Sequence, residues 1–442
     1  MRSFCITSRI QVHRSLSYTT AESRGLVKSM IWNKLKNFWK ILGPGLVTGG
    51  ADDDPSGIAT YSQAGAQFGL ATLWLALITF PLMSSVQEMC ARIGLVTSNG
   101  LTGTLKKNYP KTILYLMVLF SFPAIVLNIG ADIAGMGAVA NLIIPKVRAE
   151  YFSVAFTLAL LVILLFLPYQ KIAAVLKYLC AFLLVYLIVP FLSQQDWWDI
   201  VKHTLIPTWH FNKEFIGILV AVLGTTISPY LFFWQATMEV EDQKHKKRHL
   251  LINKKIIREM GVDIDFGMFF SNLVMYFIIL TTGTVLFNGG IHHIETVEQA
   301  AKALESLAGP AAYFLFAIGV IGTGFLAIPV LCGSLAYIVS EAFGWEEGLD
   351  KKFHEAKAFY VVIVISLVVG LFINTLGISP VQALIDSALL YGITAPVIIA
   401  IVLHISNNQR IMGKFTNGKW SNFFGGLTLV LMTVSVFFYF LA

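Results

Sequence analysis

Apolar segments of about 20 residues recur along almost the whole chain, and they constrain its fold more than any other feature. A bilayer core about 30 Å thick is crossed by a helix of roughly 20 residues. Only helices and closed barrels can satisfy their backbone polar groups there. Of 442 residues, 56% are hydrophobic and 13% charged, whereas about 25% charged is usual in soluble domains. We therefore expect an all-α polytopic membrane protein with eleven transmembrane helices. The predicted spans are 41–66, 69–93, 113–143, 152–168, 170–193, 214–240, 264–287, 310–340, 356–375, 380–404 and 420–441.

The positions of Lys and Arg predict the orientation, because cytoplasmic loops retain an excess of these residues. With the N-terminus inside, 27 of the 32 Lys and Arg residues fall on the cytoplasmic side. We therefore predict an inner-membrane protein with a cytoplasmic N-terminus and an external C-terminus. The run from Lys244 to Arg248 then lies in a cytoplasmic loop and requires no nucleic-acid partner. The five residues predicted outside are Lys146, Arg148, Lys202, Lys213 and Lys302.

The first forty residues read as a basic cytoplasmic tail. The first thirty contain five Lys and Arg residues against the single acid Glu22. Their composition resembles a transit peptide, but without an apolar signal core we expect either a plain basic tail or an extension before a start at Met30. The cysteines lack metal-site or C-x-x-C spacing, so we expect free thiols. They are Cys5, Cys90, Cys180 and Cys332.

The first predicted span is interrupted by three consecutive acids, Asp52, Asp53 and Asp54, followed by Pro55. Each Asp costs about 2.5 to 3.5 kcal/mol at the bilayer centre, and the proline removes a backbone donor. A broken helix facing a polar cavity would compensate, and secondary transporters bind their ions at such half-helix ends. An extramembrane loop is the alternative, although the apolar pieces on either side are too short to span alone.

The sixth predicted span is interrupted in a similar way by Ser228-Pro229. Ser-Pro alone is equally consistent with a simple kink. Its position five spans after the first break is typical of an inverted repeat, with the binding site at the repeat interface. We therefore predict five regions along the chain. These are a tail at 1–40, a first five-helix repeat at 41–193, an external connection at 194–213, a second repeat at 214–404, and a loop with an eleventh helix at 405–442.

The sequence motifs at both breaks resemble those of a known protein family. Asp54-Pro55-Ser56-Gly57 resembles the Asp-Pro-Gly-Asn motif of the Nramp divalent-metal transporters, and the segment from Gly224 to Tyr230 resembles their Met-Pro-His motif. The resemblance extends from about residue 42 to 404. It implies a LeuT-like fold with two inverted five-helix repeats, broken helices 1 and 6, and an added eleventh helix. It also implies a transporter, neither an enzyme nor the holder of a resident cofactor, that works by alternating access around a metal ion.

The metal-binding positions depart from the family pattern. Asp54 is retained, but Gly57 replaces the family's Asn and Ser228 its Met. Loss of a soft thioether weakens the case for iron or manganese selectivity. A wider, oxygen-lined site suits Mg²⁺, which keeps several waters. The pattern resembles the Nramp-related magnesium transporter branch, so we expect Mg²⁺, and with it Mn²⁺, to move partly hydrated. The candidate metal-site residues are Asp53, Asp54, Gly57, Thr225, Ser228 and Tyr230.

The positions that the family uses for proton movement also differ. Tyr230 stands where Nramp proteins have a His, and Gly135 where the third helix has an acid. Tyrosine titrates near 10 and cannot relay protons at neutral pH. We therefore expect transport without obligate proton coupling. Asp132 remains in the third span, where a structural and a functional role are equally consistent. The possible pathway residues are Asp52, Asp132 and Asp386.

The sequence also permits other interpretations. A proton-coupled Mn²⁺ or Fe²⁺ transporter is the nearest alternative, followed by an organic-solute symporter of the same fold. An intramembrane aspartyl protease would need a Gly-x-Gly-Asp pattern, which the sequence lacks. Glu88 and Arg92 have the spacing of a helix salt bridge. The cluster His292, His293, Glu295 and Glu298 is expected to be a surface loop rather than a metal trap.

Overall fold

The computed structural model describes residues 43–167, 185–192, 196–245, 252–304, 309, 312–373 and 377–441. Every secondary-structure element within these residues is helical, which confirms the all-α prediction. The predicted tail at 1–40, together with Cys5 and Cys180, lies outside the described residues. The fifth predicted span is described only over α9 (Val185–Leu192).

The remaining ten predicted spans are helical. The first is broken into α2 (Pro44–Asp52) and α3 (Pro55–Phe68), and the sixth into α11 (Lys213–Thr226) and α12 (Pro229–His245). One connection predicted as a loop contains the short helix α5 (Leu101–Asn108). Helix α10 (Trp197–Leu205) lies in the predicted external connection, and α14 (Val297–Ala301) and α19 (Gln409–Met412) in later ones. The other long helices are α4 (Trp74–Thr97), α6 (Lys111–Ile143), α7 (Ala149–Phe166), α13 (Lys254–Thr282), α16 (Ala312–Phe343), α17 (Lys357–Ile373), α18 (Pro380–Asn407) and α20 (Lys419–Leu441).

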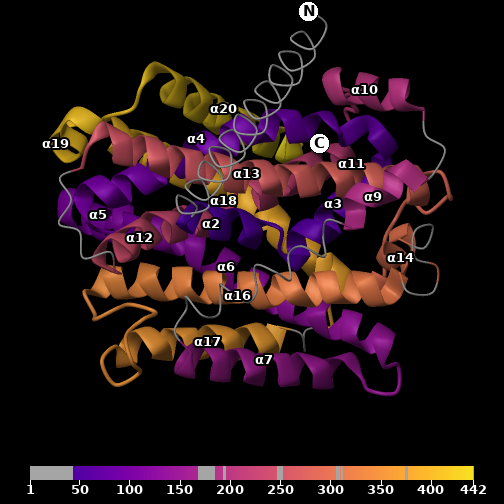
Figure 1. Ribbon diagram of the computed structural model, residues 1–442, viewed down its shortest axis with the longest axis horizontal. Coiled ribbons are helices and arrows are strands. Elements are labelled where there is room, and N and C mark those ends of the chain that lie inside the picture. Colours follow the sequence, from indigo (N-terminus) through magenta and orange to yellow (C-terminus); the bar gives the residue numbers. More distant parts are fainter. Residues whose placement is uncertain are drawn as a thin grey trace, which may run out of the picture. The chain divides into compact units, whose positions relative to one another are not determined.

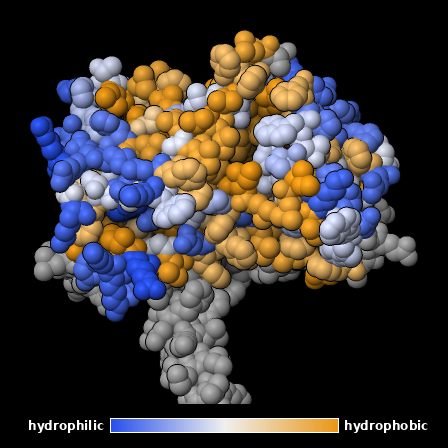
Figure 2. Space-filling model, turned by 90° about the horizontal axis from the view of Figure 1, so that it is seen from above, coloured by the Kyte–Doolittle hydropathy of each residue, from blue (hydrophilic) through white to orange (hydrophobic). Residues whose placement is uncertain are grey.

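The surface of the described residues is that of a membrane protein. Seven helical segments are long and apolar enough to cross a bilayer, α11 with α12 counting as one, while α17 is a shorter apolar helix. Figure 2 shows apolar residues across the middle of the molecule and polar residues gathered toward its two ends. Large side chains such as Leu119, Phe166 and Phe440 are more than 65% exposed. Such an apolar belt is stable in lipid but not in water.

A proline begins the second half of each broken helix. The α region is disfavoured for a residue before proline, and Asp54 is extended, with φ −70° and ψ 171°. Helix α2 therefore ends at Asp52, and α3 begins at Pro55, where the missing N–H costs nothing. At the second break Pro229 likewise begins α12. Both interruptions predicted from the sequence are therefore confirmed.

Glycine contacts bring α13 against the first broken helix. A Cβ on Gly49 would lie 2.2 Å from the carbonyl oxygen of Gly267, so only glycine permits this close approach of α2 and α13. Close contact between small residues is a usual way for membrane helices to associate. In Figure 1, α2 and α3 lie in the centre of the molecule, with α16 next to them and α17 and α7 farther out. The two breaks therefore lie inside the helix bundle.

Candidate metal site

The two helix breaks meet through hydrogen bonds between their residues. The Tyr230 hydroxyl of α12 donates to the carbonyl of Ala51, near the end of α2, over 2.8 Å. On the other halves of the broken helices, the hydroxyls of Tyr61 and Thr226 lie 3.0 Å apart. These side chains are buried. The backbone groups released by the two prolines are thus concentrated in one polar region within the bundle.

Asp54 is the N-cap residue of α3, and its carboxylate is held from two directions. Its Oδ1 accepts hydrogen bonds from the N–H of Gly57 over 2.7 Å and from the hydroxyl of Ser56 over 2.8 Å. Its Oδ2 accepts from Nδ2 of Asn128 on α6 over 2.9 Å. Backbone donors and the positive end of the helix stabilise an ionised carboxylate at this position. Asp54 can therefore remain a charged ligand although it is only 1% exposed.

Asn128 was missed by the sequence analysis. It lies in the middle of an apolar span, four residues before Asp132 and therefore on the same face of α6. Its Oδ1 accepts a hydrogen bond from Ser387 of α18 over 2.8 Å. A polar residue deep in an apolar helix often marks a pathway, and this signal could have revealed Asn128.

The second break supplies oxygen atoms. Ser228 donates its hydroxyl to the carbonyls of Gly224 and Thr225 over 3.1 and 2.5 Å, and the hydroxyls of Thr225 and Ser56 lie 3.4 Å apart. A Cβ on Gly57 would lie 3.2 Å from the carbonyl oxygen of Asp52 and 3.4 Å from Oδ1 of Asp54. Residue 57 therefore borders the Asp54 carboxylate, as the motif resemblance implies.

Asp52 and Asp53 contact a different helix from Asp54. The Ser271 hydroxyl of α13 donates to Oδ2 of Asp52 over 2.6 Å, and Oδ1 of Asp53 lies 3.3 Å from the same hydroxyl. The other oxygens, Oδ1 of Asp52 and Oδ2 of Asp53, have no hydrogen-bond partner among the described residues. The three acids are thus divided, with Asp54 bonded to α6 and the other two to α13.

The remaining candidates occupy distinct positions. Asp132 is fully buried on α6, and neither of its oxygens meets hydrogen-bond geometry with a described residue. Gly135 lines a small apolar hollow of about 20 Å³ with Val139 and Leu384. Asp386 is partly buried and accepts a hydrogen bond from Gln382, one turn away on its own helix, over 2.7 Å.

The buried acids have no basic partners among the described residues. In the described part of the chain, no ion pair includes Asp52, Asp53, Asp54 or Asp132. Nor do three or more His, Cys, Asp or Glu side chains gather there in a metal-binding cluster. A cation at Asp54 would therefore be completed by hydroxyls, carbonyls or waters, which are the ligands that hard divalent ions accept.

Three secondary predictions are also confirmed. Arg92 and Glu88 form a salt bridge of 3.4 Å, and Cys90 and Cys332 are free and buried. The side chains of His292, His293, Glu295 and Glu298 are all exposed, as the surface prediction requires, although Glu298 belongs to the short helix α14 and not to the loop.

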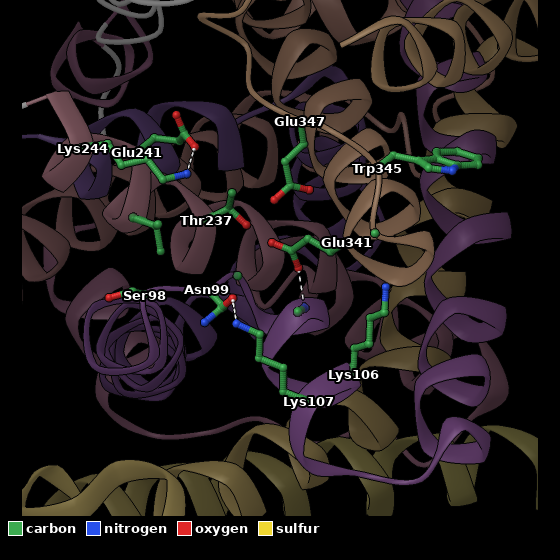
Figure 3. A pocket seen from close by; sticks show the side chains of 14 residues that line it. Ser98, Asn99, Lys106, Lys107, Thr237, Glu241, Lys244, Glu341, Trp345 and Glu347 are labelled. Atoms are coloured by element: carbon green, nitrogen blue, oxygen red, sulfur yellow. Dashed lines mark hydrogen bonds and ion pairs between the residues drawn. The ribbon is translucent and has the colours of Figure 1, made fainter. Parts of the chain in front are cut away.

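A cavity of about 480 Å³ opens at a lysine-rich end of the bundle, between α5, α12 and the segment after α16. Figure 3 shows the carboxylates of Glu341 and Glu347 pointing toward one another in this cavity. Glu341 accepts a hydrogen bond from the N–H of Gly103 over 2.7 Å, at the start of α5. Burial and the neighbouring Glu341 carboxylate raise the pKa of Glu347 to about 8. Lys106, Lys107 and Lys244 also line the cavity.

The chain matches the family model described as natural resistance-associated macrophage protein-like over residues 45–441. It is 24% identical over 397 residues to the divalent metal cation transporter MntH of Caldanaerobacter subterraneus, covering 89% of this chain and 91% of the relative. It is 24% identical over 422 residues to the metal transporter nramp1 homolog of Dictyostelium discoideum, covering 92% and 75%.

Solved structures share its fold. The Eremococcus coleocola manganese transporter, solved with an aromatic bis-isothiourea compound, superposes with a TM-score of 0.71 at 19% identity, covering 91% of this chain and 86% of that one. MhsT in complex with L-phenylalanine gives a TM-score of 0.59 at 12% identity, covering 90% and 98%. These likenesses confirm the LeuT-like fold with two broken helices. The match over nearly the whole chain shows that this integral membrane protein belongs to the Nramp family.

Proposed function

We propose that this protein is a secondary transporter of divalent metal cations, carrying Mg²⁺, and with it Mn²⁺, as partly hydrated ions by alternating access. The observation that carries the proposal is the position of Asp54, a buried carboxylate where both broken helices meet. A hard divalent ion needs a formal negative charge in a low dielectric, and carbonyl and hydroxyl oxygens can complete its shell. The names of the metal-transporting relatives support the substrate class.

The absence of large or soft side chains at two positions supports magnesium. Gly57 adds no side chain beside Asp54, and Ser228 offers a hydroxyl that is already bonded to backbone carbonyls. Waters would therefore bridge the ion to Asp54 and to the Thr225 carbonyl. Mg²⁺ tolerates this arrangement because it dehydrates reluctantly.

A proton-coupled Mn²⁺ or Fe²⁺ transporter is the second candidate. One observation favours it, namely the buried Asp132 carboxylate, which could carry a proton in place of the missing acid at position 135. The organic-solute symporter alternative rests on likeness of fold alone, at 12% identity to MhsT.

We propose the orientation predicted from the sequence, with the N-terminus in the cytoplasm and the C-terminus outside. The lysines around the cavity of Figure 3 support it, because Lys106, Lys107 and Lys244 would then face the cytoplasm. The cavity would be part of the cytoplasmic side of the transporter.

An uptake assay with purified protein in liposomes tests the proposal. The wild type should transport Mg²⁺ and Mn²⁺, and Ca²⁺ poorly, because Ca²⁺ prefers six to eight ligands. Asp54→Ala should abolish uptake while the protein elutes and melts as a folded species. If wild-type uptake of Mn²⁺ or Fe²⁺ is indifferent to millimolar Mg²⁺, the magnesium assignment is wrong. If folded Asp54→Ala transports at the wild-type rate, the site assignment is wrong.

A further inference from the structure

The three acids of the first break are consecutive in sequence but lie at helix ends of opposite partial charge. Asp54 lies at the N-terminal end of α3, where the N–H of Gly57 and the helix dipole offset its charge. Asp52 is the last residue of α2, and Asp53 follows it. The C-terminal end of a helix carries partial negative charge and unsatisfied carbonyls, so it attracts cations and repels carboxylates. Asp52 and Asp53 therefore need a positive charge more than Asp54 does.

No side chain in the described residues supplies that charge. Asp52 and Asp53 are each 1% exposed and form no ion pair there. Each has one oxygen bonded to, or near, the Ser271 hydroxyl, and each has a second buried oxygen without a partner. An isolated buried carboxylate is costly unless it is protonated, paired or bound to a metal. The two unpartnered oxygens are the independent sign that a ligand belongs here.

We propose that Asp52, Asp53 and Ser271 form a second divalent-cation site, separate from the transport site at Asp54. One divalent ion would balance the charges of the Asp52 and Asp53 carboxylates when both are ionised, and the Ser271 hydroxyl is a further oxygen ligand. The glycine contact between Gly49 and Gly267 holds α13 against α2 one turn before Ser271, which fixes this hydroxyl beside the two acids. The inference rests on the proposed function for the class of ion.

Binding stoichiometry distinguishes the second site from the first. The experiment titrates the purified full-length chain in lipid nanodiscs with Mn²⁺ and measures free Mn²⁺ by its electron paramagnetic resonance signal. We expect two ions per wild-type chain, and one each for Asp54→Asn and for the double variant Asp52→Asn with Asp53→Asn. Mg²⁺ should compete at both sites.

Ser271→Ala keeps all the acids. It therefore still tests the second site if the double variant fails to fold. It should lower the affinity for one of the two Mn²⁺ ions about tenfold, which is a usual effect of losing a supporting group at a metal site. Ser334→Ala is the matched control, because Ser334 is equally buried but, among the described residues, its hydroxyl bonds only to the Val330 carbonyl of its own helix. It should leave both affinities unchanged.

The outcomes separate this inference from the proposed function. One bound ion in the wild type, lost in Asp54→Asn and unaffected by Ser271→Ala or the double variant, would overturn the second site and leave the proposed function intact. One ion lost only in the Ser271 and double variants would support the second site and contradict Asp54 as the transport ligand. One Mn²⁺ ion at Asp54, together with Na⁺ binding that depends on Asp52 and Asp53, would overturn the divalent assignment.

Discussion

Asn128 on α6 donates a hydrogen bond from Nδ2 to Oδ2 of Asp54 over 2.9 Å, and this bond links the third span to the break in the first. It occupies one carboxylate oxygen, while the start of α3 bonds the other. Asn128 therefore fixes the direction in which the proposed metal ligand points. Supporting groups of this kind orient metal ligands and commonly affect affinity strongly.

Replacing Asn128 should weaken metal binding without removing the ligand. In Asn128→Ala, Asp54 loses a charge-assisted hydrogen bond worth roughly 1.5 to 3 kcal/mol. We expect the half-saturating Mg²⁺ concentration in liposome uptake to rise roughly tenfold or more, with the protein still folded. Ser387→Ala keeps the bond from Asn128 to Asp54 and removes the bond that orients Asn128, together with a bond to the Leu384 carbonyl of its own helix. It should have a smaller effect. Unchanged Mg²⁺ dependence in Asn128→Ala would show that Asp54 does not depend on this bond.

Transport should proceed without obligate proton entry. The Tyr230 hydroxyl is bonded to the Ala51 carbonyl, and Gly135 faces an apolar hollow, so neither position offers a group that titrates near neutral pH. Liposomes containing a pH-sensitive dye should take up Mg²⁺ under a membrane potential without acidification of the lumen.

Asp132→Asn tests the remaining candidate relay. If uncoupled transport holds, this variant should show no change in proton movement. Stoichiometric acidification in the wild type that disappears in Asp132→Asn would assign proton coupling to Asp132 and favour the Mn²⁺ or Fe²⁺ alternative.

Restoring the family side chains should change ion selectivity. A side chain at residue 57 begins 3.4 Å from Oδ1 of Asp54, so Gly57→Asn would place an amide beside the ion and take space from its waters. Ser228→Met adds a soft ligand. The double variant should transport less Mg²⁺ relative to Mn²⁺ or Cd²⁺ in competition assays, and each single change should do so more weakly. An unchanged Mg²⁺ to Mn²⁺ ratio would mean that these positions do not line the ion's path.

The stability of the lysine-rich end should depend on pH through Glu347. Burial and Glu341 raise the pKa of Glu347 from 4.5 to about 8. Between these values the folded chain keeps a proton that the unfolded chain has lost, so the free energy of unfolding falls as pH rises through this window. Glu347→Gln has no carboxylate and escapes this penalty. At pH 9 its free energy of unfolding should exceed that of the wild type by on the order of 1 kcal/mol after allowance for solvent screening, and its melting temperature should be higher. At pH 4 the two proteins should melt at about the same temperature.

Glu346→Gln is the matched control for that experiment. Glu346 is the exposed neighbour and is paired with Lys351. Its replacement should not raise the melting temperature at pH 9. Equal pH profiles for Glu347→Gln and the wild type, measured by thermal melting in detergent, would contradict the assignment.

The sequence alone determined the helical membrane architecture and both breaks. Length and hydropathy required spans of about 20 residues. The three acids before Pro55, and the position of Pro229 five spans later, predicted the interruptions, because proline disfavours the α conformation at the preceding residue. These are local rules, so they can be applied before the fold is known. The family followed from the resemblance of the Asp54 motif and was shown by the match over residues 45–441.

Only the tertiary structure decided which groups meet at the breaks. Asn128, Ser271 and Ser387 come from three different helices and reach the acids of the first break, directly or through one another. No spacing in the sequence relates them, because the facing of packed helices depends on contacts such as Gly49 with Gly267. For the same reason the sequence could not show that the three consecutive acids contact different helices. Asp54 lies at the positive end of α3, whereas Asp52 and Asp53 contact α13. That division depends on the direction of each side chain, which only packing of the complete bundle determines.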